Sequence, residues 1–133
     1  MSAFDGTTVF ARGAENTAFA QYFVGQSYLN MLTTKGVPIG NVTFEPACRN
    51  NWHTHRGGQI LLVTAGRGFY QEWGKEAREL RAGDVVVIPA NVKHWHGAAK
   101  DSWFVHLAVE IPGEGTANEW CEPVSDEEYN QLP

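Results

Sequence analysis

The 133-residue sequence has little positive charge and no long apolar run. Ten Lys and Arg residues stand against fifteen Asp and Glu residues, and the formal net charge of -5 leaves no basic surface for nucleic acid. The longest largely apolar run, residues 60–65, is far shorter than the ~20 residues of a membrane span. We therefore expect no nucleic-acid and no membrane partner, and a small molecule is the expected binding partner.

Cysteine is also scarce, because only Cys48 and Cys121 are present and their separation fits no zinc-site motif. Residues 1–10 show no basic stretch followed by an apolar one, so we expect no secretory signal and a cytoplasmic location. Reduced thiols are then expected rather than a disulfide. Cys48 lies near several histidines in the sequence and stays open as an alternative metal ligand.

The residues that are abundant favour one β-rich domain over residues 1–133. Apolar residues make up 43% and charged residues 19% of the chain, as in ordinary globular proteins. A chain of this length buries about two thirds of its unfolded surface. The fourteen glycines and five tryptophans favour turns and strands over long helices.

Short strand patterns recur along the chain between turn signals. Strands are expected over residues 22–32, 37–44, 52–55, 59–65, 68–73, 77–80, 85–88, 95–98 and 103–111. Turns are expected at residues 66–68, 74–76 and 81–84. Strands at this spacing predict an all-β sandwich or barrel.

The two ends of the chain differ from this β-rich middle. Residues 1–20 are expected to form an extended arm, and the tail over residues 112–133 is polar and acidic. Ser125 and Glu128 have the spacing of a capping box, which predicts a short helix there. An irregular tail packed on the surface is the alternative.

Four of the five histidines form two His-x-His pairs, His53 with His55 and His94 with His96. Side chains alternate along a strand, so each pair shares a face, and Gln59 has the parity of His55 unless the glycines between them form a bulge. A single histidine is usually a half-buried polar residue. Two such pairs among five histidines favour a site for a divalent metal ion.

Two stretches resemble the motifs of the cupin superfamily. The first motif, His-x-His followed by Glu and Gly, is matched by His53, His55, Gln59 and Gly66, and the second is matched by Gly83, Pro89 and His94. The resemblance implies a single cupin domain, a jelly-roll-like double-stranded β-helix whose motif core spans about residues 40–111. It also implies that one divalent metal ion is held by His53, His55, Gln59 and His94.

Gln59 departs from the family pattern, in which a glutamate often holds the ion. A glutamine binds through a neutral carbonyl oxygen, so the four ligands carry no negative charge. The ion would then act as a stronger Lewis acid. A neutral ligand set also disfavours Fe(III), which argues against oxygenase chemistry.

The sequence further resembles the small bacterial manganese-dependent cupins known as (R)-hydroxynitrile lyases. The similarity covers roughly residues 40–130 and runs through residues 42–46, 52–55, 59, 63–66, 81–86, 93–99, 106–108, 119–120 and 125–129. It implies Mn²⁺ as the ion, with Fe²⁺, Zn²⁺ and Ni²⁺ as alternatives. It also implies cleavage of (R)-cyanohydrins such as mandelonitrile into an aldehyde and hydrogen cyanide.

In that interpretation the two remaining histidines move protons. His106 is expected to be the main acid/base, with His96 as its helper or as support for a metal ligand. His106 shares its strand face with Glu110, so Glu110 is also expected to line the substrate pocket. There it would either hydrogen-bond His106 and raise its pKa or repel cyanide.

The walls of the substrate pocket are expected to come from four apolar or small residues that alternation places on inner strand faces. They are Gly40, Val42, Phe44 and Leu61. Ordinary core residues would show the same alternation, so this assignment depends on where the site lies.

Two other classes of function stay open. One is a metal-dependent oxygenase, isomerase or decarboxylase-associated enzyme acting on another small molecule, and the other is a non-catalytic small-molecule-binding cupin. In all three classes the outward apolar side chains of Ile60, Leu62 and Val87 would be uncovered on a lone barrel. A homodimer, or an oligomer built from dimers, is therefore expected.

Overall fold

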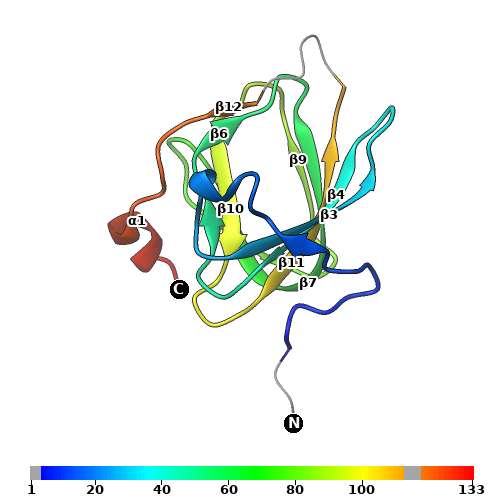
Figure 1. Ribbon diagram of the computed structural model, residues 1–133. Helices are drawn as coiled ribbons and strands as arrows, with labels where there is room; N and C mark the ends of the chain where they lie inside the picture. Colours follow the sequence, from blue (N-terminus) through cyan, green and yellow to red (C-terminus); the bar gives the residue numbers. More distant parts are fainter. Residues whose placement is uncertain (1–3, 113–117) are drawn as a thin grey trace.

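The computed structural model describes residues 4–112 and 118–133, and its strands curl into a barrel with one short α-helix outside the wall (Figure 1). The elements in chain order are β1 (Ala14–Glu15), the 3-10 helix η1 (Ala20–Tyr22), β2 (Phe23–Val24), β3 (Ser27–Thr33), β4 (Ile39–Phe44), β5 (Arg49–Asn50), β6 (His53–Thr54), β7 (Gln59–Glu72), β8 (Arg78–Arg81), β9 (Val85–Ile88), β10 (His94–Ala98), β11 (Phe104–Glu110), β12 (Glu119–Trp120) and α1 (Asp126–Asn130). The all-β class is confirmed.

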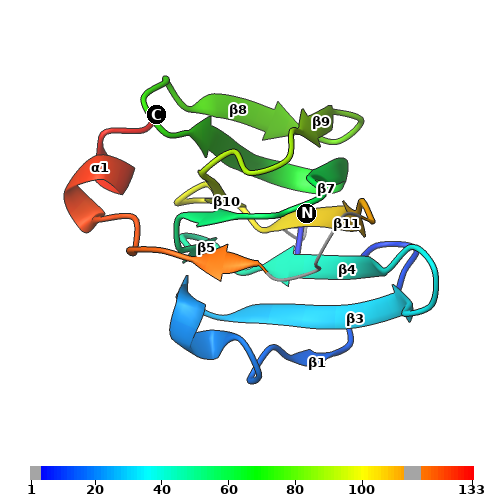
Figure 2. The same ribbon diagram turned by 90° about the horizontal axis from the view of Figure 1, so that it is seen from above.

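One long strand, β7, takes part in strand pairing on two sides of the barrel (Figure 2). Its first half pairs with β11 and β9, and its second half pairs with β10 and β8. All of these pairings are antiparallel. Strand β7 therefore connects β11, which carries His106, to β10, which carries His94 and His96.

The turn expected at residues 66–68 is wrong, because β7 runs through it without reversing. Gly66 has a φ of 78°, and a Cβ atom there would lie 1.9 Å from the carbonyl oxygen of Trp103. The pairing of β7 with β11 shifts register nearby, between Val105 and His106. The glycine thus permits a close crossing and a bend in the strand.

The strand expected over residues 22–32 is divided into β2 and β3. Gly25, with a φ of 91°, lies between them, and β2 pairs with β5 whereas β3 pairs with β4.

At the other end of the chain the predicted capping box is confirmed. Ser125 accepts a hydrogen bond from the backbone N–H of Glu128, whose side chain in turn accepts from the N–H of Ser125.

Two hydrophobic clusters stabilise the barrel. The first fills its interior, and the second lies under α1, where Trp52, Trp95 and Tyr129 are almost completely buried. Arg49 connects the helix to the barrel, since its guanidinium lies 4.3 Å from the ring centre of Tyr129 and contacts Asp126 at 2.7 Å. No helix in the described residues is both long and apolar enough to cross a membrane.

Candidate functional site

Three of the histidines meet where β6 and β10 run side by side. His53 and His94 are direct cross-strand partners, and their ring centroids lie 4.2 Å apart. The ring of His55, just after β6, lies 4.9 Å from that of His53 and 5.3 Å from that of His94. All three side chains are buried. The convergence expected from strand alternation is therefore present.

His96 lies beside this group. Ring nitrogens of His53, His94 and His96 all lie within 4.8 Å of one another, which is close enough for three histidines to hold a metal ion. His55 lies outside that narrower trio. Which nitrogens can bind an ion depends on the hydrogen bonds that each ring already makes.

The hydrogen bonds of His53 and His94 direct the opposite side of each ring toward the site. The Nδ1 of His53 donates to the carbonyl oxygen of Asn51 at 2.7 Å, and the Nδ1 of His94 donates to that of Val92 at 2.8 Å. A neutral imidazole with its proton on Nδ1 has its lone pair on Nε2. The Nε2 of His94 is buried and has no hydrogen-bond partner in the described structure.

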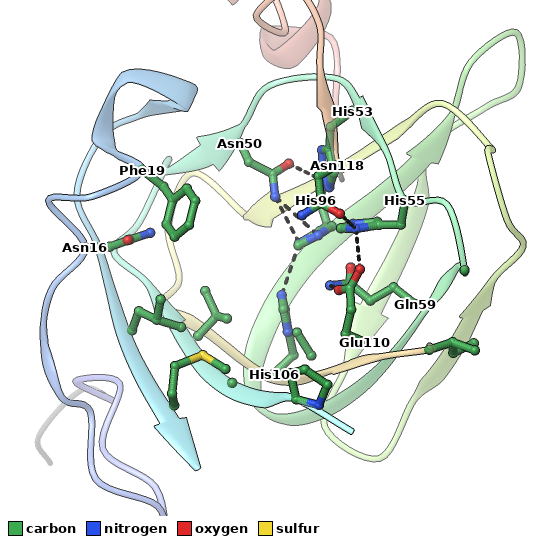
Figure 3. A pocket seen from close by; sticks show the side chains of 18 of the residues that line it. Asn16, Phe19, Asn50, His53, His55, Gln59, His96, His106, Glu110 and Asn118 are labelled. Carbon is green, nitrogen blue, oxygen red and sulfur yellow. Dashed lines mark hydrogen bonds and ion pairs between the residues drawn. The ribbon is translucent and has the colours of Figure 1, made fainter. Parts of the chain in front are cut away.

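Glu110 orients the other two predicted ligands (Figure 3). Its Oε2 accepts from Nε2 of Gln59 at 3.2 Å, and its Oε1 lies 3.0 Å from Nδ1 of His55. Asn118 also accepts from that nitrogen, at 2.7 Å. These contacts leave the Nε2 of His55 and the Oε1 of Gln59 buried without a partner among the described residues. The expected bond from Glu110 to His106 is not made.

Three buried acceptor atoms thus lack partners at one place: His55 Nε2, Gln59 Oε1 and His94 Nε2. Buried polar atoms are nearly always hydrogen-bonded, so a group of orphaned acceptors indicates a missing cation or donor. Nitrogen and carbonyl oxygen donors suit a divalent first-row metal. The residues present therefore fit the metal ion that the sequence predicts.

His96 and His106 form a second, adjoining pair. Nε2 of His106 lies 3.0 Å from Nδ1 of His96, and both rings are buried. Burial lowers the pKa of His106 to about 4, and it also holds the pKa of His96 well below its ordinary value. Both rings are therefore neutral at pH 7 and can accept a proton.

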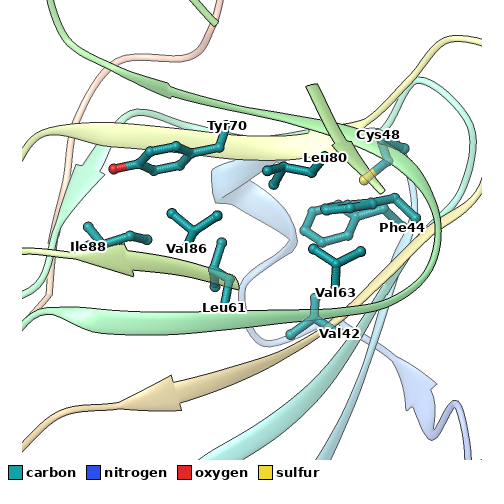
Figure 4. Close-up of a cluster of buried hydrophobic side chains, with 11 residues drawn as sticks. Val42, Phe44, Cys48, Leu61, Val63, Tyr70, Leu80, Val86 and Ile88 are labelled. Atoms are coloured by element: carbon teal, nitrogen blue, oxygen red, sulfur yellow. The ribbon is translucent and has the colours of Figure 1, made fainter. Parts of the chain in front are cut away.

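These side chains line one end of a cavity of about 520 Å³. Gly40, Val42 and Glu110 line it as expected. Phe44 and Leu61 instead lie in the interior hydrophobic cluster, fully buried (Figure 4). Alternation places a side chain inside the barrel, but it does not say whether that side chain packs in the interior cluster or lines the cavity.

Phe44 still packs against the histidine pair, since its ring centroid lies 5.8 Å from that of His96 and 5.4 Å from that of His106. Cys48 is a free, buried thiol in the same hydrophobic cluster, and Cys121 is also free. Neither cysteine belongs to the group of residues that could hold a metal ion in the described structure.

Three residues of the site were given no role from the sequence. Asn50 contacts His96, Asn118 contacts His55, and Trp120 lies with its ring centroid 4.7 Å from that of His53. Trp120 also stacks on Tyr22 at 4.5 Å, which joins the segment around β12 to the segment around η1. Asn118 and Trp120 lie in the polar tail, where nothing in the local pattern indicates contact with a strand more than sixty residues earlier.

Comparisons with known proteins agree with this architecture. Residues 40–110 match the cupin domain family. The chain is 47% identical over 116 residues to a protein named (R)-mandelonitrile lyase from Granulicella tundricola, a match that covers 84% of this chain and 88% of that one. A shorter match, 27% identical over 67 residues, is to an acireductone dioxygenase of Bacillus mycoides and covers 47% of this chain and 39% of that one.

Among solved structures, a cupin-like protein from Thermotoga maritima superimposes with a TM-score of 0.88. It is 44% identical, and the match covers 94% of this chain and 96% of that one. The barrel, the histidine group on β6 and β10, and these relatives lead to one conclusion: the chain belongs to the cupin family.

Proposed function

We propose that this cupin is a metal-dependent carbon–carbon lyase that cleaves (R)-cyanohydrins such as mandelonitrile into an aldehyde and hydrogen cyanide. One observation carries the proposal: the side chains of His55 and Gln59, whose orphaned acceptor atoms fit a metal ion, line the same cavity as a neutral, hydrogen-bonded histidine pair. The relative named (R)-mandelonitrile lyase, similar over most of both chains, supports the choice of reaction.

The ligands in this proposal are His53, His55, Gln59 and His94, and the ion is Mn²⁺, with Fe²⁺, Zn²⁺ or Ni²⁺ as alternatives. The orphaned atoms of His55 and Gln59 favour this set over the trio that contains His96, because both ring nitrogens of His96 already have partners. When bound, the ion supplies Lewis acidity that lowers the pKa of a substrate hydroxyl.

The histidine pair supplies the proton transfers. His106, supported by His96, accepts the proton of the cyanohydrin hydroxyl group. The bond between the carbinol carbon and the nitrile carbon then breaks, its electron pair leaves with cyanide, and the hydroxyl oxygen becomes the aldehyde carbonyl. The same proton returns to cyanide, and hydrogen cyanide leaves. Burial keeps both rings neutral at pH 7, so a ring nitrogen is available to accept the proton.

The rest of the cavity suits an apolar substituent. Away from the histidines its wall is formed by Phe19, Phe23, Leu29, Met31 and other apolar side chains. A cavity of about 520 Å³ lies within the ordinary size range of small-molecule sites. A phenyl group placed there would leave the hydroxyl and nitrile groups at the polar end.

The test is benzaldehyde release from racemic mandelonitrile by the Mn²⁺-loaded protein, compared with a His106→Ala variant loaded in the same way. We expect the variant to lose about 10²- to 10⁴-fold in kcat, the range for removal of an acid/base group. Equal release by both proteins, or no release above the buffer rate, would rule out this assignment.

The same preparations test the other two classes. Oxygen uptake by the Fe²⁺-loaded protein with a candidate substrate would favour an oxygenase, in line with the shorter match to acireductone dioxygenase. Tight binding of a small molecule with no change in product would favour a binding protein.

A further inference from the structure

Asn50, on β5, is buried beside His96. The backbone N–H of His96 donates to Oδ1 of Asn50 at 2.9 Å. Because the oxygen is held there, the amide nitrogen must face the imidazole of the same residue. Nδ2 of Asn50 lies 3.2 Å from Nε2 and 3.4 Å from Nδ1 of His96 (Figure 3).

This orientation selects the tautomer of His96. An amide nitrogen only donates, so the nearer ring atom, Nε2, must present its lone pair. A neutral imidazole then carries its proton on Nδ1, which donates to Nε2 of His106 at 3.0 Å. The opposite tautomer would place an Nε2–H against the N–H of Asn50, an unfavourable contact between two donors.

The same reasoning extends to His106. Since its Nε2 accepts from His96, its own proton lies on Nδ1, which is buried without a hydrogen-bond partner in the described structure. One backbone hydrogen bond on Asn50 thus determines the direction of a chain of three side chains: Asn50 donates to His96, and His96 donates to His106.

We propose that Asn50 is a positioning residue that fixes the tautomers of His96 and His106, with the proton of each neutral ring on Nδ1. The use of this pair in proton transfer rests on the lyase function proposed above.

The assignment can be measured without metal or substrate, so its failure is distinct from failure of the lyase proposal. Long-range ¹H–¹⁵N correlation spectra of the metal-free, ¹⁵N-labelled protein near pH 8 report which ring nitrogen is protonated. His96→Gln and His106→Gln variants assign the signals. In the wild-type protein we expect the proton on Nδ1 in both rings.

Asn50→Asp provides the decisive variant, because a carboxylate still accepts from the backbone N–H of His96 but has no proton to donate to its ring. We expect Nε2 of His96 to become protonated in this variant. A role of Asn50 in packing alone would alter stability without moving this proton. Asn30→Asp is the matched control, since Asn30, on β3, donates to the carbonyl oxygen of Ala11 and makes no hydrogen bond to either histidine of the pair in the described structure. The histidine signals of this variant should match those of the wild type.

Two results would overturn the proposal. One is a wild-type His96 ring protonated on Nε2, which needs no variant and is therefore independent of whether Asn50→Asp folds. The other is a folded Asn50→Asp protein in which Nε2 of His96 still lacks a proton.

Discussion

At the residue scale, Gln59 shows that the charge of a site is not given by its ligand atoms alone. Its carbonyl oxygen is neutral, as the sequence predicts, but its amide nitrogen donates to the carboxylate of Glu110. The same carboxylate lies 3.0 Å from Nδ1 of His55. A negative charge thus stands directly behind two of the proposed ligands, where it orients them and favours a bound cation.

The first prediction separates the two possible histidine sets. His55→Ala should weaken Mn²⁺ binding by more than about 100-fold, since loss of a residue behind a ligand already weakens binding by about 10- to 100-fold. His96→Ala should keep most of the affinity, because both ring nitrogens of His96 have partners within the protein. Calorimetric titration of the metal-free proteins measures both values, and the opposite ranking would assign the ion to the trio with His96.

The second prediction concerns the stability of the folded protein at acidic pH. Burial lowers the pKa of His106 in the folded protein to about 4, below the value of 6.5 expected for an unfolded chain. Between these values the unfolded state binds the proton and the folded state does not, so stability falls as pH falls from 6.5 to 4. His106 alone contributes up to about 3 kcal/mol to this loss.

Urea denaturation of the metal-free protein at pH 7.0 and 4.5 measures this effect as the change in unfolding free energy. A His106→Asn variant should lose clearly less stability than the wild type over the same interval, whatever its stability at pH 7. Identical losses would show that His106 does not titrate in this way.

At the scale of elements, β7 decides where the two histidine groups lie, because its halves pair with β11 and β10. Its continuity depends on Gly66, where the backbone is left-handed and passes close to the carbonyl of Trp103. The residues before Gly66 pair with β11 and those after it pair with β10, so the strand bends at this glycine. A glycine signal that usually marks a turn therefore marks a bend inside one strand.

The third prediction follows from that bend. Gly66→Ala should lower the free energy of unfolding by well over the roughly 1–2 kcal/mol of a left-handed residue, because its Cβ would also overlap the Trp103 carbonyl oxygen. Gly74→Ala is the matched control, with a φ of 83° and no atom within 4 Å of its Cβ. Chemical denaturation compares the two, and equal losses would mean that the close crossing is unimportant.

At the scale of the whole molecule, one outer face of the barrel is apolar. Val85 and Val87 on β9 are 51% and 64% exposed, and each pairs across the strand with an outward residue of β7, Leu62 and Ile60. On the other side of β7, Leu107 of β11 pairs with Leu62, and Val109 pairs with Ile60. Two rows of apolar side chains therefore cross β9, β7 and β11. We propose that a second copy of the chain covers this face, as the sequence predicts, because adjoining apolar rows of this kind mark interfaces.

The fourth prediction tests this interface. Sedimentation velocity should show a dimer for the wild-type protein and a shift to monomer for Val87→Lys, because a buried unpaired ammonium group opposes association. Val9→Lys introduces the same charge at a side chain that is 89% exposed on the arm, and it should leave the dimer intact. A monomeric wild-type protein would exclude the proposed assembly.

Much of the fold was predictable because its signals are local. Strand alternation placed His53 and His55 on one face, short strands at regular spacing indicated the barrel, and Ser125 with Glu128 indicated the terminal helix. The errors arose where a local signal had two structural meanings. A glycine can mark a turn or a bend, and an inward apolar residue such as Phe44 or Leu61 can line a cavity or fill a core.

The sequence by itself determined the family, the histidine pairs and the presence of Gln59, because spacing along a strand and the chemistry of a side chain are properties of the chain. Only the tertiary structure decided which atoms are free to bind an ion and which way the histidine pair points. Those properties depend on partners from distant segments, Asn50, Glu110 and Asn118, and a hydrogen bond exists only when folding brings its donor and acceptor within about 3 Å.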